Sequence, residues 1–66
     1  MIGRRIKELR TEKGLTQQEL AEILNVSSMS ISFYENEQRK PDSDFIISVS
    51  KYFGVSTDYL LGKTYK

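Results

Sequence analysis

Four side chains on one face of a predicted helix offer hydrogen bonds and apolar contacts to a partner. Two are small hydroxyls and two are large apolar groups: Ser28, Ser32, Met29 and Phe33. Their spacing places them on one side of the helix, whereas Ile31 and Tyr34 face the other side. Serine hydroxyls both donate and accept hydrogen bonds, and Met and Phe add apolar surface. This chemistry suits binding.

The residue types that are missing limit catalysis and metal binding. The chain has no cysteine and no histidine, so it lacks disulfides, zinc–thiolate sites, a nucleophilic thiol and the commonest general base. Its nine acidic residues could supply a carboxylate pair, but a chain of 66 residues forms one small domain with little surface from which to build a pocket around them. We therefore expect no enzyme, no cofactor and no small-molecule ligand.

Basic residues form two clusters on either side of this uncharged helix face. The clusters are Arg4, Arg5, Lys7, Arg10 and Lys13, then Arg39 and Lys40. The formal net charge is only +1, so the distribution matters more than the total. Flanking clusters suit phosphate contacts on both sides of a groove, although each residue taken singly could equally solvate a helix surface. No segment suits a membrane span or signal-peptide core, and we expect a cytoplasmic protein.

The uncharged face lies on the second of two helices whose ends are marked by capping residues. Thr16 and Glu19 form a capping box, which starts a helix with one apolar stripe. Asn25 ends that helix, because asparagine tolerates a left-handed backbone, and Ser27 starts a second helix running to about Glu35. A break of about three residues between two helices is typical of a helix-turn-helix.

The rest of the chain carries three further helical patterns. A first helix, apolar at every third or fourth position, ends near Gly14. Residues 36–41 form a polar loop, because the proline disfavours helix before it. Asp42 or Ser43 then caps a fourth helix, and Ser56 starts a short fifth one. These patterns predict an all-α fold, a compact bundle of five short helices.

Four segments, taken together and in order, resemble the phage repressor and Cro-like (XRE-type) helix-turn-helix family of transcriptional regulators. They are RIKELR, GLTQQELAEILNVS, SISFYE and GVSTDYLLG, and the match covers nearly the whole chain. The resemblance implies a lambda-repressor-like DNA-binding domain over residues 1–62, with residues 63–66 as a tail or the start of a linker. It also implies that the helix near Ser28–Tyr34 lies in the major groove of a two-fold symmetric operator.

The resemblance assigns roles to individual residues. Base-facing positions fall on Ser28, Met29, Ser32 and Phe33. Because none of the four is Arg, Lys, Asn or Gln, we expect an A·T-rich half-site recognised partly by its shape, with the apolar pair against thymine methyls. The open alternative for Met29 and Phe33 is that they line the core. Contacts to DNA phosphates are implied for Gln17, Gln18, Asn36, Arg39, Lys40 and Ser43.

Four further positions concern the scaffold. Arg10 and Glu35 match positions that the family often pairs, which implies a structural ion pair between the first and third helices. The family usually has glycine where this chain has Asn25 and Glu37. An acidic side chain at Glu37 would repel nearby phosphates, and this leaves the path of the following loop open.

The C-terminal helices offer surface for self-association, since their apolar residues exceed what a small bundle covers: Tyr59, Leu60, Leu61 and Tyr65. We therefore expect a dimeric, sequence-specific regulator of double-stranded DNA, a repressor of phage or mobile-element type. The alternative is an antirepressor- or antitoxin-like protein-interaction module on the same scaffold, anchored by Met29 and Phe33. A steep salt dependence of DNA binding separates the two.

Overall fold

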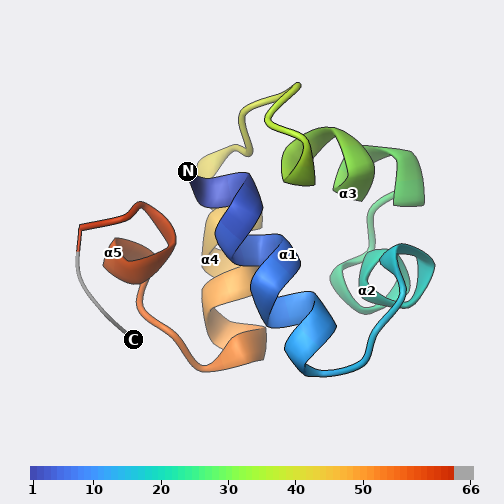
Figure 1. The fold of residues 1–66 in the computed structure, drawn as a ribbon, viewed down its shortest axis with the longest axis horizontal. Coiled ribbons are helices and arrows are strands. Elements are labelled where there is room, and N and C mark those ends of the chain that lie inside the picture. Colours follow the sequence, from blue (N-terminus) through green and yellow to red (C-terminus); the bar gives the residue numbers. More distant parts are fainter. Residues whose placement is uncertain (64–66) are drawn as a thin grey trace.

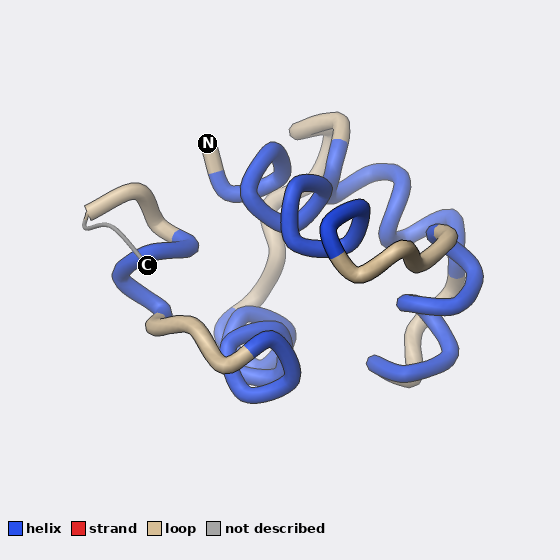
Figure 2. The backbone as a smooth tube through the Cα atoms, turned by 60° about the horizontal axis from the view of Figure 1, so that its bottom comes forward, coloured by secondary structure: helices blue, strands red, loops and turns tan. Residues whose placement is uncertain are grey.

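Five helices surround one core in the computed structural model, which describes residues 1–63 (Figure 1). They are α1 (Ile2–Glu12), α2 (Gln17–Leu24), α3 (Ser28–Glu35), α4 (Ser43–Phe53) and α5 (Thr57–Leu60). The backbone of the described residues contains helices and loops but no strand (Figure 2). The predicted all-α bundle is confirmed, and α2 and α3 form the helix-turn-helix.

Four of the five helices begin at the capping residues that the sequence marks. In each case the cap side chain accepts a backbone N–H from the first turn: Thr16, Ser27, Asp42 and Ser56. The capping box is complete, because Glu19 N donates to Thr16 Oγ1 at 3.0 Å and Thr16 N donates to Glu19 Oε1 at 2.8 Å. Asp42, not Ser43, caps α4. Asn25 ends α2 with a left-handed φ of 59°.

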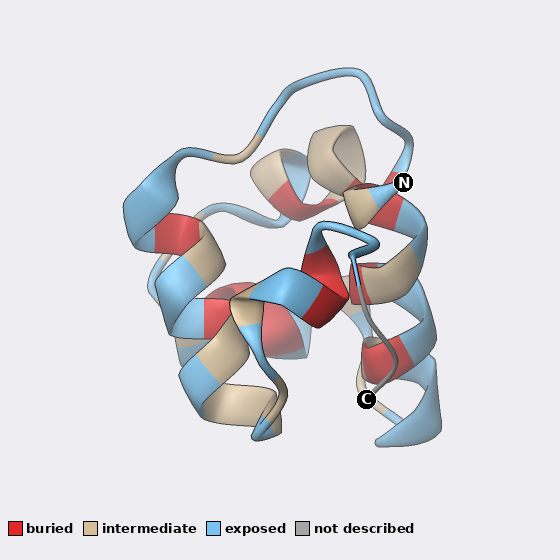
Figure 3. Ribbon diagram, turned by 90° about the vertical axis from the view of Figure 1, so that its left-hand side faces the viewer, coloured by how far each residue is buried: buried red, intermediate tan, exposed pale blue. Residues whose placement is uncertain are grey.

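Each helix contributes its apolar face to the shared core (Figure 3). The five fully buried large side chains come one from each helix: Ile6, Leu20, Ile31, Val49 and Leu60. Full burial of such a side chain contributes about 1.5–3 kcal/mol. Tyr34 of α3 adds an aromatic contact with Phe45 of α4, with ring centroids 4.5 Å apart. α3 therefore packs mainly against α1 and α2, with a further ring contact to α4.

The N-terminal turn of α1 approaches the end of α3 closely at Gly3. A Cβ atom on Gly3 would lie 2.1 Å from the backbone oxygen of Tyr34 and 2.9 Å from Cδ of Glu37. The first contact is with backbone, which cannot rotate away as a side chain can. Glycine is therefore required here by the close approach of two chain segments.

Three cations of the first segment contact three different helices. The pairs are Arg10 with Glu35 of α3, Lys13 with Tyr52 of α4, and Arg5 with Tyr59 of α5. The Arg5 guanidinium carbon and the Lys13 Nζ lie 4.6 Å and 4.8 Å from the two ring centroids. Cation–ring contacts of this kind contribute about 0.5–1 kcal/mol at exposed sites. Much of the N-terminal basic cluster expected at phosphates is thus used to hold the bundle together.

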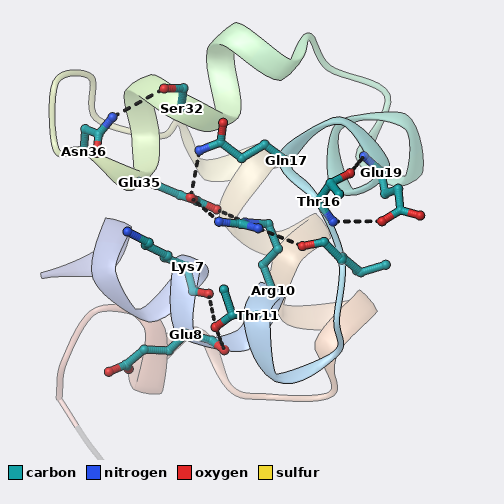
Figure 4. A network of polar contacts seen from close by, with 11 residues as sticks. Lys7, Glu8, Arg10, Thr11, Thr16, Gln17, Glu19, Ser32, Glu35 and Asn36 are labelled. Carbon is teal, nitrogen blue, oxygen red and sulfur yellow. Dashed lines mark hydrogen bonds and ion pairs between the residues drawn. The ribbon is translucent and has the colours of Figure 1, made fainter.

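The Arg10–Glu35 ion pair is almost closed to solvent, with side-chain exposures of 11% and 1%. Arg10 Nε and Nη2 donate to the two carboxylate oxygens at 2.6 Å and 3.1 Å (Figure 4). Arg10 Nη1 donates to the backbone oxygen of Leu15 at 2.7 Å, and Gln17 Nε2 donates to Glu35 Oε1 at 3.1 Å. Every charged atom of the pair has a partner, and this offsets the cost of burying it.

Replacement of Gly3 by alanine tests the close approach of α1 to α3. Gly3→Ala lowers the free energy of unfolding by about 1–3 kcal/mol, because the new methyl group must displace the α3 backbone. At an exposed helix position the same change stabilises by about 0.5–1 kcal/mol, so the sign is diagnostic. Urea unfolding followed by circular dichroism measures the effect, with Ser48→Ala on the exposed side of α4 as control. A Gly3→Ala variant more stable than the parent would contradict the contact.

A double-mutant cycle tests the buried pair. Arg10→Met leaves Glu35 as a buried charge without its cation, and we expect a loss of about 3–5 kcal/mol. Arg10→Met combined with Glu35→Gln costs less than the sum of the two single changes, because the double variant strands no charge. Unfolding by urea at neutral pH gives the four free energies. Strictly additive losses would show that the two groups are not coupled.

Candidate nucleic-acid interface

The outer face of α3 is uncharged and most accessible in its first turn. Ser28 is exposed, and Met29 is 65% exposed. Ser32 and Phe33, one turn further on, are half-buried. The Ser32 hydroxyl accepts a hydrogen bond from Asn36 Nδ2 at 3.3 Å (Figure 4). The four residues assigned to bases lie on one face at helical spacing, and the first two are the more open to a partner.

Phe33 lies beneath a cation from the loop that follows α3. The guanidinium carbon of Arg39 is 5.0 Å from the centroid of the Phe33 ring. Within residues 1–63, neither the buried core nor the apolar residues packed against it include Phe33 or Met29. The alternative that these two side chains line the core is therefore wrong. The contact holds an arginine over the outer face of α3.

The first turn of α2 meets the last residue of α3. Gln17 is the first residue of α2 and is half-buried. Its side-chain amide donates a hydrogen bond to the carboxylate of Glu35. A primary amide has two N–H groups, so the second can donate to an outside group. Gln18 is exposed beside it. The first backbone N–H groups of a helix attract anions, and these features suit a phosphate.

The loop between α3 and α4 carries the remaining residues expected at phosphates. Asn36 ends α3, Arg39 and Lys40 are exposed, and Ser43 is the exposed first residue of α4. Because Gln17 contacts Glu35, this loop and the first turn of α2 meet at the same end of α3. The structure thus places Gln17, Asn36 and Arg39 at the C-terminal end of α3, whereas Lys40 and Ser43 lie further along the loop.

Glu37 does not project alone from this loop. Its Oε2 accepts a hydrogen bond from the backbone N–H of Arg4 at 3.1 Å. The positive end of the α1 dipole favours a carboxylate at that place. Glu37 and Asn25 are the two non-glycine residues with positive φ among those described, at 61° and 59°. Both positions where the family usually has glycine therefore keep the left-handed backbone that glycine would supply.

Sequence reasoning missed two contacts that shape this loop. The Glu37 side chain contacts Arg4, which lies 33 residues away in the chain, and the Arg39 guanidinium contacts the Phe33 ring from the loop after α3. The one available signal was the position of Glu37, where the family's glycine implies a left-handed backbone. That signal predicts the backbone angle but not the partner of the side chain.

The described part of the chain shows neither a metal-binding cluster nor a membrane-spanning helix. No group of three or more histidine, cysteine, aspartate or glutamate side chains in residues 1–63 is arranged to hold a metal ion. None of the helices in the same range is both long and apolar enough to cross a membrane.

Comparison with known proteins supports one family. A helix-turn-helix family model matches residues 6–60. The HTH-type transcriptional regulator ImmR of Bacillus subtilis (strain 168) is 48% identical over 62 residues, which are 94% of this chain and 49% of ImmR. The regulator SinR of the same organism is 40% identical over 67 residues, covering 100% of this chain and 60% of SinR. The chain therefore spans about half the length of these relatives.

Solved structures match the fold over nearly the whole chain. The P22 c2 repressor, crystallised in complex with a synthetic operator, has a TM-score of 0.89 at 30% identity, with 97% of each chain covered. SinR, crystallised in complex with DNA, has a TM-score of 0.83 at 40% identity, with 92% of this chain and 98% of that chain covered. The chain therefore belongs to the phage-repressor-like (XRE-type) helix-turn-helix family.

Proposed function

We propose that this protein binds operator DNA as a dimeric, sequence-specific transcriptional repressor, with α3 in the major groove. The observation that carries the proposal is the arrangement around α3. Its outer face is uncharged and open at Ser28 and Met29, whereas Gln17 and Arg39 contact its last turn. The P22 c2 repressor and SinR, both similar to this chain, are known in complex with an operator and with DNA. Residues 1–62 are the proposed DNA-binding domain.

Phosphate contacts would fix the position of α3 without specifying sequence. The proposed set combines neutral donors with two loop cations: Gln17, Gln18, Asn36, Ser43, Arg39 and Lys40. The Arg10–Glu35 pair has no direct part in this set, but it holds Gln17 at the end of α3 through the bond to Glu35. Each phosphate neutralised by a cation contributes about one unit to the salt slope of binding.

Base contacts would come from the outer face of α3, mainly from its exposed first turn. The Ser28 hydroxyl can donate or accept at several base edges, and Met29 can pack on a thymine methyl group. Ser32 and Phe33 contribute less directly, because Asn36 and Arg39 already contact them. Such weakly discriminating groups fit an A·T-rich half-site whose shape carries part of the specificity.

A second copy of the chain is the proposed partner beside α5. A groove of about 330 Å³ lies there. Its apolar lining includes Ile2, Pro41, Ile46 and Leu61, and the loop residues Glu37, Arg39 and Lys40 line it as well, so the proposed dimer surface adjoins the proposed phosphate contacts. Leu61 is 49% exposed, whereas Tyr59 and Leu60, also expected at the interface, are buried in the core. Tyr65, the fourth residue expected there, lies outside the described residues. The expected cytoplasmic location follows from the DNA partner.

The second candidate function is a protein-interaction module on the same scaffold. The observation in its favour is the exposed Met29 on a helix face without charge. Phe33 suits this role less than expected, because Arg39 stacks on its ring. One relative, 38% identical over 63 residues, is the antitoxin PezA of Streptococcus pneumoniae, of which this chain covers 40%.

Selection of duplexes from a random pool tests the proposed function. We expect a two-fold symmetric, A·T-rich site with half-sites about one helical turn apart. Titration of the selected duplex across salt concentrations should give a steep slope, about one unit for each phosphate contacted. Enrichment of sharply guanine-specific half-sites would refute the proposed base contacts, and the absence of any enriched duplex would favour the protein-partner function.

Substitution of Leu61 tests the proposed dimer surface. Leu61→Asp places a charge among the apolar residues of the groove, and we expect cooperative operator binding to weaken by at least about tenfold. Ile47→Asp is the matched control, because Ile47 is 45% exposed, compared with 49% for Leu61, and does not line the groove. Gel-shift titration with one and two half-sites separates dimer contacts from DNA contacts. Unchanged cooperative binding to two half-sites by Leu61→Asp, or an equal loss of it by Ile47→Asp, would contradict this surface.

A further inference from the structure

Glu37 caps a helix that does not cap itself. α2, α3, α4 and α5 each begin with a side chain that accepts a backbone N–H from their own first turn. α1 begins after Met1, which supplies no such bond, and its first turn contains no acidic residue. Glu37 supplies both missing features, since its carboxylate accepts the Arg4 N–H at 3.1 Å.

The surroundings of Glu37 are built for this contact. Gly3 precedes Arg4, and a Cβ on Gly3 would lie 2.9 Å from Cδ and Oε2 of Glu37. The bare backbone of Gly3 therefore leaves room for the carboxylate. Glu37 in turn adopts a φ of 61°, a conformation that residues other than glycine, asparagine and aspartate seldom adopt. Glutamate thus occupies a strained backbone position at which its carboxylate accepts the Arg4 N–H.

The contact anchors the loop that holds the proposed phosphate-binding cations. Glu37 lies two residues before Arg39 and three before Lys40. Beyond this anchor, Arg39 stacks on Phe33 of α3 at 5.0 Å. The start of the loop is also bonded to α3 through its backbone, since the N–H groups of Glu37 and Gln38 donate to the carbonyls of Tyr34 and Phe33 at 3.2 Å and 2.8 Å. The Glu37 side chain adds an attachment to α1, and both exposed cations lie within three residues of it.

We propose that Glu37 is a positioning residue for DNA binding: it strengthens binding, although its charge is negative, because it holds Arg39 and Lys40 in place. This inference rests on the proposed function. Electrostatics alone makes the opposite prediction, since an acidic group beside phosphates weakens binding. The sign of the effect therefore distinguishes positioning from simple repulsion.

Three variants separate the side chain's charge from its hydrogen bond. Glu37→Gln removes the charge but keeps an oxygen that can accept the Arg4 N–H. Glu37→Gly removes both and suits the left-handed backbone, so it relieves strain. Glu8→Gln removes one negative charge from an exposed position on α1, where it makes only an exposed ion pair with Arg4 at 3.5 Å. All three raise the net charge by one.

Fluorescence anisotropy with the selected operator duplex at several salt concentrations gives the main readout. We expect Glu37→Gln and Glu8→Gln to bind at least as tightly as the parent. Glu37→Gly should bind roughly tenfold more weakly, and its salt slope should fall by about one unit for each phosphate that its cations no longer reach. Tighter binding by Glu37→Gly than by the parent would overturn the proposal, because it would show repulsion alone.

Amide hydrogen exchange by NMR in the free protein tests the anchor without DNA. The Arg4 amide should exchange faster in Glu37→Gly than in the parent, and at the parental rate in Glu8→Gln. Equal rates in the parent and Glu37→Gly would overturn the proposed anchor even if DNA binding is intact. If the anchor is present but the folded parent binds no duplex, the proposed function fails instead, and the positioning role in DNA binding fails with it.

Discussion

The buried ion pair between Arg10 and Glu35 is the interaction on which the rest of the structure depends. It joins α1 to the last residue of α3, and it also fixes the connection before α2 through Leu15 and the first turn of α2 through Gln17. A charge removed from water is tolerated only when its hydrogen-bonding groups are satisfied. The pair therefore demands one relative placement of α1, α2 and α3, which apolar packing alone would specify less strictly.

Around that pair, α1 serves as the clamp of the domain. Its cations Arg10 and Arg5 contact α3 and α5, and its C-cap Lys13 contacts α4. Gly3 allows its first turn to touch the end of α3. The positive charge of the first segment is thereby used largely inside the bundle. The surface near α3 takes its charge instead from Arg39 and Lys40, which explains how a chain of net charge +1 can still present cations where a phosphate is expected.

Local signals made the fold predictable, whereas contacts between distant residues were not. The caps Thr16, Ser27 and Ser56 act on their own first turns, so helix starts follow from short segments. The face of α3 follows from helical spacing. The Arg10–Glu35 pair came from family resemblance, since 25 residues separate its members. The partner of Glu37 had no signal at all, because neither periodicity nor composition specifies which residue lies across a tertiary contact.

The unequal capping of the helices has a consequence for the order in which they form. A helix with its own cap closes its first turn from neighbouring residues, at little entropic cost. The first turn of α1 is capped by the carboxylate of Glu37, 33 residues away from Arg4 in the chain. The entropic cost of closing a loop of that length must be offset by interactions that have already formed. The folding nucleus should therefore lie in α2 and α3, two self-capped helices that are adjacent in the chain and pack directly against each other. The beginning of α1 should be the last helical turn to order.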